Sequence, residues 1–279
     1  MNPRPLVLSL FPGIDLFGRG FEAEGFCVVR GPDLMTGGDI RDFTPAESRF
    51  DGIIGGPPCQ EFSRANRRRD PARGALMLAE FSRCVTTAKP TWWLMENVPT
   101  VPDLRIPGYT WQRTDFDALE IGAEQRRLRH FQFGVLLGGH SSGVPAGHTL
   151  TIERVSGRRG VTVPTVTGKT PLPFPRLCEL QGLTGPLALE FFSAEGRRQA
   201  VANAVHFGVA RAVAAAVREC VFTRARHTDD PLCACGCGRP VTGRERTAGI
   251  ACRKRLQRQR AKYSIHPMSA LGAGSQDAS

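Results

Sequence analysis

A chain of 279 residues with 41% hydrophobic residues is long enough for one large core and a small appendage. The net charge of +11 favours a polyanionic partner such as nucleic acid. No apolar run reaches the roughly 20 residues that span a bilayer, and nine cysteines without a recognisable signal peptide indicate reduced thiols. We therefore expect a cytoplasmic protein without a membrane partner.

Short apolar strands alternate with helical stretches along the first half of the chain. The expected strands are residues 6–11, 27–30, 52–54, 92–95 and 129–135, and the expected helices are residues 17–23, 75–88, 176–181 and 195–221. This alternation predicts an α/β fold, in which helices cover both faces of a mostly parallel sheet.

The composition also divides the chain into parts. Residues 1–136 and 176–222 are expected to form one α/β domain, and residues 137–175, rich in Gly, Ser, Thr and Pro, form a loop or short hairpin within it. Residues 223–262 are a basic segment that contains cysteines, and residues 263–279 have the composition of a disordered tail.

The first strand leads into a glycine turn that is a candidate ligand-binding loop. Gly13 lets a ligand approach the backbone closely, and the N-terminus of the following helix stabilises an anionic group. Asp39 follows the second strand after a short connection, where its carboxylate accepts a hydrogen bond from an exocyclic amine. The alternatives are an ordinary glycine turn and an exposed turn aspartate.

A proline–cysteine pair follows the third strand. Pro58 and Cys59 place a thiol at the carboxyl edge of the sheet, where open α/β folds bind their ligands. Pro58 has a fixed φ and restricts the residue before it, so the backbone at Cys59 is held in one conformation. A thiol held in this way suits a nucleophile, and a buried structural cysteine is the alternative.

A carboxylate and two guanidiniums come next. Glu96 ends an apolar strand, where burial raises a carboxyl pKa and makes the group a candidate general acid, unless it caps a helix. Strand alternation predicts that Gln125, Arg127 and Arg129 share one face and bind a phosphate or a carboxylate. A solvated edge strand is the alternative.

In this order, the motifs resemble those of the cytosine-C5 DNA methyltransferase family over nearly all of residues 6–217. The matching segments are residues 11–15 for the cofactor loop, 38–40 for an acid that contacts adenine, 56–60 for the catalytic loop, 96–98 for the catalytic glutamate, 125–129 for the arginine motif, and 176–182 and 199–205 for the closing segments.

The resemblance implies a Rossmann-like methyltransferase fold that binds S-adenosylmethionine and acts as a monomer on double-stranded DNA. Cys59 then attacks C6 of a flipped cytosine, Glu96 acts at N3, Arg127 holds the base carbonyl or the catalytic carboxylate, and Arg129 holds the loop or the DNA backbone. The implied cofactor-binding residues are Phe11, Gly13, Asp15, Asp33, Asp39, Pro58, Leu76, Asn203 and Val205.

Three departures from the family pattern bear on function. Asp15 stands where the cofactor loop usually has a second glycine and adds a charge near the sulfonium. Asp33 is the one candidate for the acid that binds the ribose hydroxyls. Residues 137–175 are much shorter than the usual target-recognition domain, and they predict a minimal recognition hairpin that carries Arg154, Arg158 and Arg159.

The C-terminal segment predicts a small zinc-ribbon-like unit. Cys233, Cys235, Cys237 and Cys252 supply four thiols, the number that a structural zinc site needs, although unliganded thiols are the alternative. The surrounding arginines and lysines suit DNA phosphates.

Three other functions stay open: the same chemistry on RNA, installation of a different group at cytosine C5, and DNA binding without catalysis. The first choice is a restriction–modification enzyme of a bacterium or of a virus that infects one.

Overall fold

The computed structural model describes residues 4–63, 67–137, 150–154, 172–185, 187, 189–223, 249–250, 252–254 and 256–257. In these residues one six-stranded sheet has the order β2-β1-β3-β4-β6-β5. The strands are β1 (Leu6–Leu10), β2 (Cys27–Arg30), β3 (Gly52–Gly55), β4 (Trp92–Asn97), β5 (Tyr109–Asp117) and β6 (Leu128–Leu136). Strands β2, β1, β3 and β4 are parallel, and β6 and β5 add an antiparallel edge. The predicted α/β fold is confirmed, with a mixed sheet.

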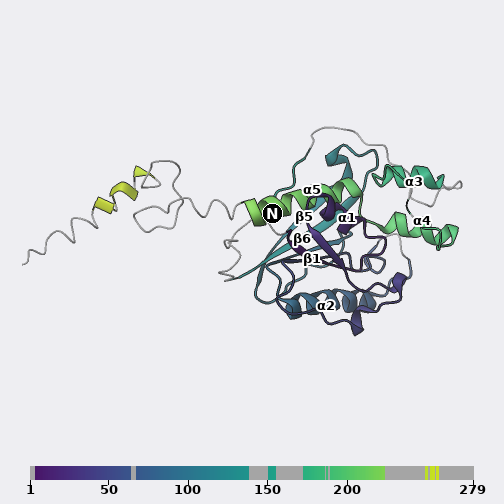
Figure 1. Cartoon of the computed structure of the whole chain (residues 1–279), viewed down its shortest axis with the longest axis horizontal. Helices are drawn as coiled ribbons and strands as arrows, with labels where there is room; N and C mark the ends of the chain where they lie inside the picture. The colour runs from purple at the N-terminus through teal and green to yellow at the C-terminus, as the bar shows by residue number, and fades with distance from the viewer. Residues whose placement is uncertain are drawn as a thin grey trace, which may run out of the picture. The chain divides into compact units, whose positions relative to one another are not determined.

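Helices cover both faces of this sheet. Helices α1 (Leu16–Ala23) and α5 (Phe207–Arg218) lie on one face, and α2 (Pro71–Ala88) lies on the other (Figure 1). Helices α1 and α5 approach closely because Gly20 has no side chain: an added Cβ would lie 2.4 Å from the Cβ of Ala210.

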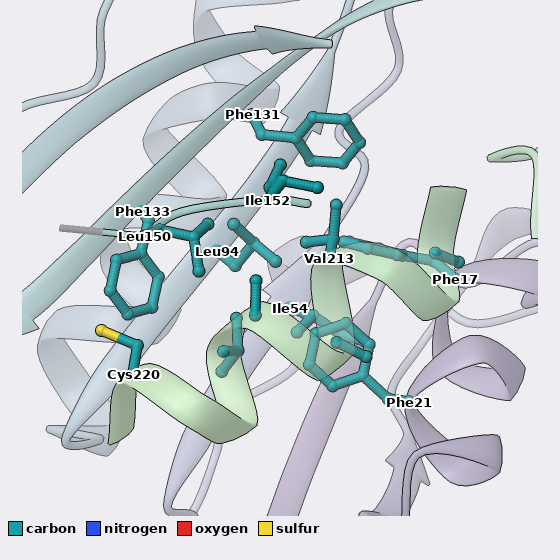
Figure 2. Close-up of a cluster of buried hydrophobic side chains, with 14 of the residues drawn as sticks. Phe17, Phe21, Ile54, Leu94, Phe131, Phe133, Leu150, Ile152, Val213 and Cys220 are labelled. Atoms are coloured by element: carbon teal, nitrogen blue, oxygen red, sulfur yellow. The ribbon is translucent and has the colours of Figure 1, made fainter. Parts of the chain in front are cut away.

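Each face has its own apolar core. Under α1 and α5, aromatic side chains such as Phe21 and Phe131 converge on aliphatic residues of the sheet and of α5, including Ile54 and Val213 (Figure 2). Under α2, Phe81 packs with a second buried cluster. Burial of these side chains is the main favourable term in folding.

Two tryptophans at the centre of the sheet join the cores. Trp92 and Trp93 are fully buried and point to opposite faces of β4, and each ring lies over a glycine of a neighbouring strand. An added Cβ would lie 2.2 Å from the ring of Trp92 at Gly52 and 2.3 Å from the ring of Trp93 at Gly134. The glycines therefore make room for the largest side chains of the core.

Helix α2 begins at Pro71 rather than at residue 75, and two larger differences concern β5 and the last helix. Strand β5 was not expected, because its sequence contains the polar run from Gln112 to Asp115. The single helix expected over residues 195–221 is two helices, α4 (Ala194–Asn203) and α5, because Ala204 is extended at φ −64° and ψ 154°. The imidazole of His206 caps α5 by accepting a hydrogen bond from the Val209 amide at 3.4 Å.

Five short elements complete the described fold. They are the 3₁₀ turns η1 (Leu34–Thr36), η2 (Ile40–Asp42) and η3 (Ala118–Ile121), helix α3 (Phe174–Leu180), and the π-helical turn η4 (Glu219–Thr223) that ends α5.

Two residues of the segment 150–154 belong to the core of the α/β domain. Leu150 and Ile152 are buried in the cluster under α1 and α5 (Figure 2), and the backbone of Leu150 exchanges two hydrogen bonds with the Gln112 side chain. Arg154, expected on a recognition hairpin, pairs with Glu120 and lies 5.2 Å from the ring centroid of Phe116. Arg158 and Arg159 lie outside the described residues.

The chain divides into two compact units, Met1–Ala225 and Arg226–Ser279. Cys252 is described and buried, whereas Cys233, Cys235, Cys237 and the tail 263–279 lie outside the described residues. Where side chains are described, no group of three or more His, Cys, Asp or Glu is arranged to hold a metal. The zinc-ribbon-like unit stays a prediction.

One described segment, Ala194–Phe222, is long and apolar enough to cross a membrane by length and composition alone. It comprises α4, α5 and η4, it is 56% buried, and its helix is interrupted at Ala204. These features are those of core helices.

Candidate active site

A cavity of about 790 Å³ lies at the carboxyl ends of β1, β3 and β4. In the order β2-β1-β3, the connections from β1 and from β3 leave in opposite directions, which is where open α/β sheets bind ligands. The lining includes Cys59, Glu96 and all of the expected cofactor residues: Phe11, Gly13, Asp15, Asp33, Asp39, Pro58, Leu76, Asn203 and Val205. Arg127 and Arg129 are not part of this lining.

The cofactor loop has a strained backbone that Asp15 holds in place. Phe11, Gly13 and Asp15 all have φ near +53°. The buried Asp15 carboxylate accepts hydrogen bonds from the hydroxyl of Ser9 and the amide of Gly18, both at 2.9 Å, and Arg30 Nε lies 2.8 Å from its other oxygen. Burial raises the pKa of Asp15, and these partners oppose the rise. Asp15 therefore holds the loop together while it also lines the cavity, and its expected effect on the sulfonium stays a prediction.

Two further aspartates border the cavity. The carboxylate of Asp33 accepts hydrogen bonds from the amide of Gly13 at 2.9 Å and from the amide of Met35 at 2.8 Å, so it ties the cofactor loop to η1. Asp39 caps η2, and hydrogen bonds from Arg41 lower the pKa of its carboxyl to about 2. Asp39 is therefore an ionised acceptor at the rim of the cavity.

The loop that carries Cys59 is held on both sides. The buried side chain of Asn97 donates to the carbonyl of Pro57 at 3.0 Å, and the amides of Phe62 and Ser63 donate to the carbonyl of Cys59 at 3.0 Å. Burial, together with the charge of Glu96, raises the pKa of the Cys59 thiol, and Arg129 and Arg127 oppose that rise. The resting thiol therefore keeps its proton at neutral pH.

Glu96 is buried at the end of β4 and pairs with Arg129, whose Nε lies 3.1 Å from Oε1. Burial raises the pKa of Glu96, and the positive charges of Arg129 and Arg127 oppose this rise. Gly56, at the start of the loop that carries Cys59, leaves room for this carboxylate: an added Cβ would lie 3.2 Å from Oε2 of Glu96.

Arg127 has contacts other than those expected. Its Nη2 donates to the carbonyl of Ala202 at 2.9 Å and to the carbonyl of Ala204 at 2.6 Å. Gln125 and Arg127 precede β6, which begins at Leu128; both are buried, whereas Arg126 and Leu128 between and beyond them are exposed. Arg129 takes the contact with the glutamate that was expected for Arg127, and its Nη1 also donates to the carbonyl of Leu128.

Sequence reasoning missed the positioning roles of Asn97 and Gly56, although both lie within quoted motifs. Asn97 bonds to a residue 40 positions away, and only the pairing of β3 with β4 brings the two together. An asparagine directly after a candidate catalytic glutamate is the signal that could have suggested the contact.

The cavity lies at the switch point of a helix-covered α/β sheet, beside a strained loop after β1, which is where open α/β folds bind their ligands. The solved methyltransferase EhMeth of Entamoeba histolytica has the same fold, with a TM-score of 0.54 and 11% identity over 80% of this chain and 99% of that chain.

Residues 33–154 match the family model of C-5 cytosine-specific DNA methylases, the family that the motif order predicted. The chain is 30% identical to the type II methyltransferases M.HgiDI of Herpetosiphon aurantiacus, over 42% of this chain and 40% of that one, and M.NgoPII of Neisseria gonorrhoeae, over 48% of each. The chain thus aligns with less than half the length of these relatives.

Proposed function

We propose that this protein is a DNA (cytosine-5)-methyltransferase that depends on S-adenosylmethionine and belongs to a restriction–modification system. The observation that carries the proposal is a shared cavity, whose lining includes the strained loop at Gly13 together with Cys59 and Glu96. A cofactor and a base bound in one cavity can meet without water between them. The type II names of the relatives support the role in DNA modification.

The residues of the cavity fit the cofactor. Gly13 allows a close approach of the cofactor to the backbone at φ +54°, whereas the N-terminus of α1 behind it is already capped by the carboxylate of Asp15. Ionised Asp39 suits an exocyclic amine, and Leu76 and Val205 offer apolar surface. A volume of about 790 Å³ is within the usual range for ligand sites. When bound, S-adenosylmethionine supplies an electrophilic methyl group to the cytosine side of the cavity.

Cys59 supplies the nucleophile. Its proton passes to water, its sulfur bonds to C6 of the cytosine, and the C5–C6 electron pair becomes available at C5 for the methyl group. Once C5 is methylated, its proton leaves to water, the sulfur–C6 bond breaks and the thiolate is released. The loop contacts from Asn97 and Phe62 hold the sulfur in place throughout.

Glu96 protonates N3 as negative charge develops on the ring and takes the proton back on elimination. A carboxyl group with a raised pKa suits this exchange near neutral pH. Arg129, paired with the same carboxylate at 3.1 Å, fixes its orientation and stabilises its ionised form.

The protein also offers a basic surface beside the catalytic loop. Arg67, Arg68 and Arg69 are exposed a few residues after Cys59, directly before the start of α2. C5 of a stacked base cannot be reached, so the cytosine has to be flipped out of the duplex into the cavity. Arginines at this place can contact the phosphates on either side of the flipped nucleotide.

The test is substitution of the nucleophile. We expect Cys59→Ala to abolish transfer of a labelled methyl group to duplex DNA while S-adenosylhomocysteine still binds in calorimetry. Cys27→Ala, at an exposed cysteine of β2, is the matched control and should retain full activity. Methyl transfer by Cys59→Ala would disprove the nucleophile, and transfer by the wild type to RNA but not to DNA would replace the proposed substrate.

A further inference from the structure

Helix α4 and the extended residues after it form one wall of the cavity. Asn203, Ala204 and Val205 line the cavity directly. Val201 is the buried residue of α4, and it packs in a small apolar cluster separate from the two cores of the sheet. This cluster also contacts Ile14 of the cofactor loop. Val205, after the end of α4, belongs instead to the core under α1 and α5, so the wall bridges two apolar clusters.

Arg127 makes polar contacts at the C-terminal end of this wall, whereas Arg198, nearer the middle of α4, donates to the carbonyl of Leu172 at 2.7 Å. Nη2 of Arg127 donates to the carbonyls of Ala202 and Ala204, one on each side of the residue where α4 ends. The last carbonyls of a helix lack partners within the helix and carry the negative end of its dipole, so a cation there is favourable. The backbone amide of Arg127 donates to the carboxylate of Asp117 at 2.8 Å, which fixes the backbone position of the arginine.

The charge of Arg127 makes this contact strong. Burial lowers the pKa of Arg127 to about 9, so the guanidinium is still charged at neutral pH. A buried charge needs polar partners. For Arg127 these include the two carbonyls, which lie 75 and 77 positions further along the chain. Arg129, two residues further on, contacts Glu96 instead.

We propose that Arg127 is a positioning residue for the cofactor. Its hydrogen bonds, which we call the latch, hold the C-terminus of α4 against the start of β6 and so keep the wall of residues 203–205 in place beside the cofactor. The two arginines then differ in their direct contacts: Arg127 binds the end of α4 and Arg129 pairs with Glu96, although the charges of both oppose the rise in the pKa of Glu96. The identity of the cofactor rests on the proposed function, whereas the latch itself rests on the contacts of Arg127.

The first experiment needs no ligand. Hydrogen–deuterium exchange of peptides that cover α4 and Ala204 should become at least tenfold faster in Arg127→Met than in the wild type, and Arg129→Met should leave it unchanged. If Arg127→Met does not fold, Arg127→Lys replaces it, because an ammonium retains the charge but spans the two carbonyls less well. Unchanged exchange at α4 in the Arg127 variants would overturn the latch.

The second experiment measures the cofactor. We expect Arg127→Lys to weaken binding of S-adenosylhomocysteine at least tenfold in calorimetry and to raise the KM for S-adenosylmethionine, with kcat at saturation largely kept. Arg129→Lys should lower kcat and leave that binding unchanged. If Arg127→Lys instead lowered kcat and left binding of S-adenosylhomocysteine unchanged, Arg127 would act on the cytosine rather than on the cofactor, and its positioning role would be overturned. A wild type that binds no S-adenosylhomocysteine would instead refute the proposed function, with the exchange result for the latch unaffected.

Discussion

Gly56 offers a direct test of how closely the carboxylate of Glu96 must be placed. Alanine at this position meets one side chain, because the added Cβ lies 3.2 Å from Oε2 of Glu96 and the next atom, the carbonyl oxygen of Glu96, is 4.0 Å away. The carboxylate would have to move by a few tenths of an ångström, away from a position fixed by burial and by the contact with Arg129 at 3.1 Å.

The magnitude follows from this displacement. Small overpacking of a close-packed site costs about 1–3 kcal/mol, and a misplacement of about 1 Å costs roughly 100-fold in rate. For a few tenths of an ångström we expect kcat to fall by roughly tenfold, which corresponds to about 1.4 kcal/mol in the barrier. A cost near the lower end of the range would lower the melting temperature by about 2–4 °C in a domain of this size.

The assay is methyl transfer to duplex DNA at saturating cofactor, with binding of S-adenosylhomocysteine measured in parallel. Binding should stay within twofold of the wild type, because Gly56 meets Glu96 rather than the cofactor loop. Gly185→Ala is the matched control, since an added Cβ there meets nothing within 4 Å. An unchanged kcat in Gly56→Ala would refute the reasoning that the placement of Glu96 limits the reaction.

Two further predictions concern the charges around the site. Glu96→Gln should speed alkylation of Cys59 by iodoacetamide at pH 7 while it abolishes turnover. The charge of Glu96 raises the pKa of the Cys59 thiol, so removal of that charge lowers the pKa. Each pKa unit by which it falls increases the thiolate fraction about tenfold. Alkylation is measured by mass spectrometry. A rate no faster than in the wild type would show that Glu96 is already neutral in the resting enzyme. Replacement of Arg67, Arg68 and Arg69 by glutamine should weaken DNA binding and make the slope of log K against log salt shallower by up to about 0.9 for each phosphate that is no longer neutralised. An unchanged slope in fluorescence anisotropy would remove these arginines from the DNA interface.

Local pattern was sufficient for the elements that begin and end at clear signals. Strands β1, β2, β3 and β4 lie where the apolar runs placed them, within two residues at each end. Strand β5 was not visible because its polar run hides the strand pattern, and the break after α4 was not visible because its partner, Arg127, is 75 positions away in the chain. Strand β5 is stabilised by pairing with β6, and the C-terminus of α4 bonds to Arg127.

The sequence by itself determined which residues lie at the carboxyl ends of the strands, since that follows from where each apolar run stops. Cys59 after β3 and Glu96 at the end of β4 are of this kind, and the structure gathers both into one cavity with Gly13. Only the tertiary structure decided how the charges pair. Asp15 bonds to Arg30, Arg129 to Glu96, and Arg127 to α4, and none of these partners is fixed by spacing along the chain. Ion pairs and buried hydrogen bonds depend on which elements the packing brings within about 3 Å, and that is set by strand order and helix docking rather than by local sequence.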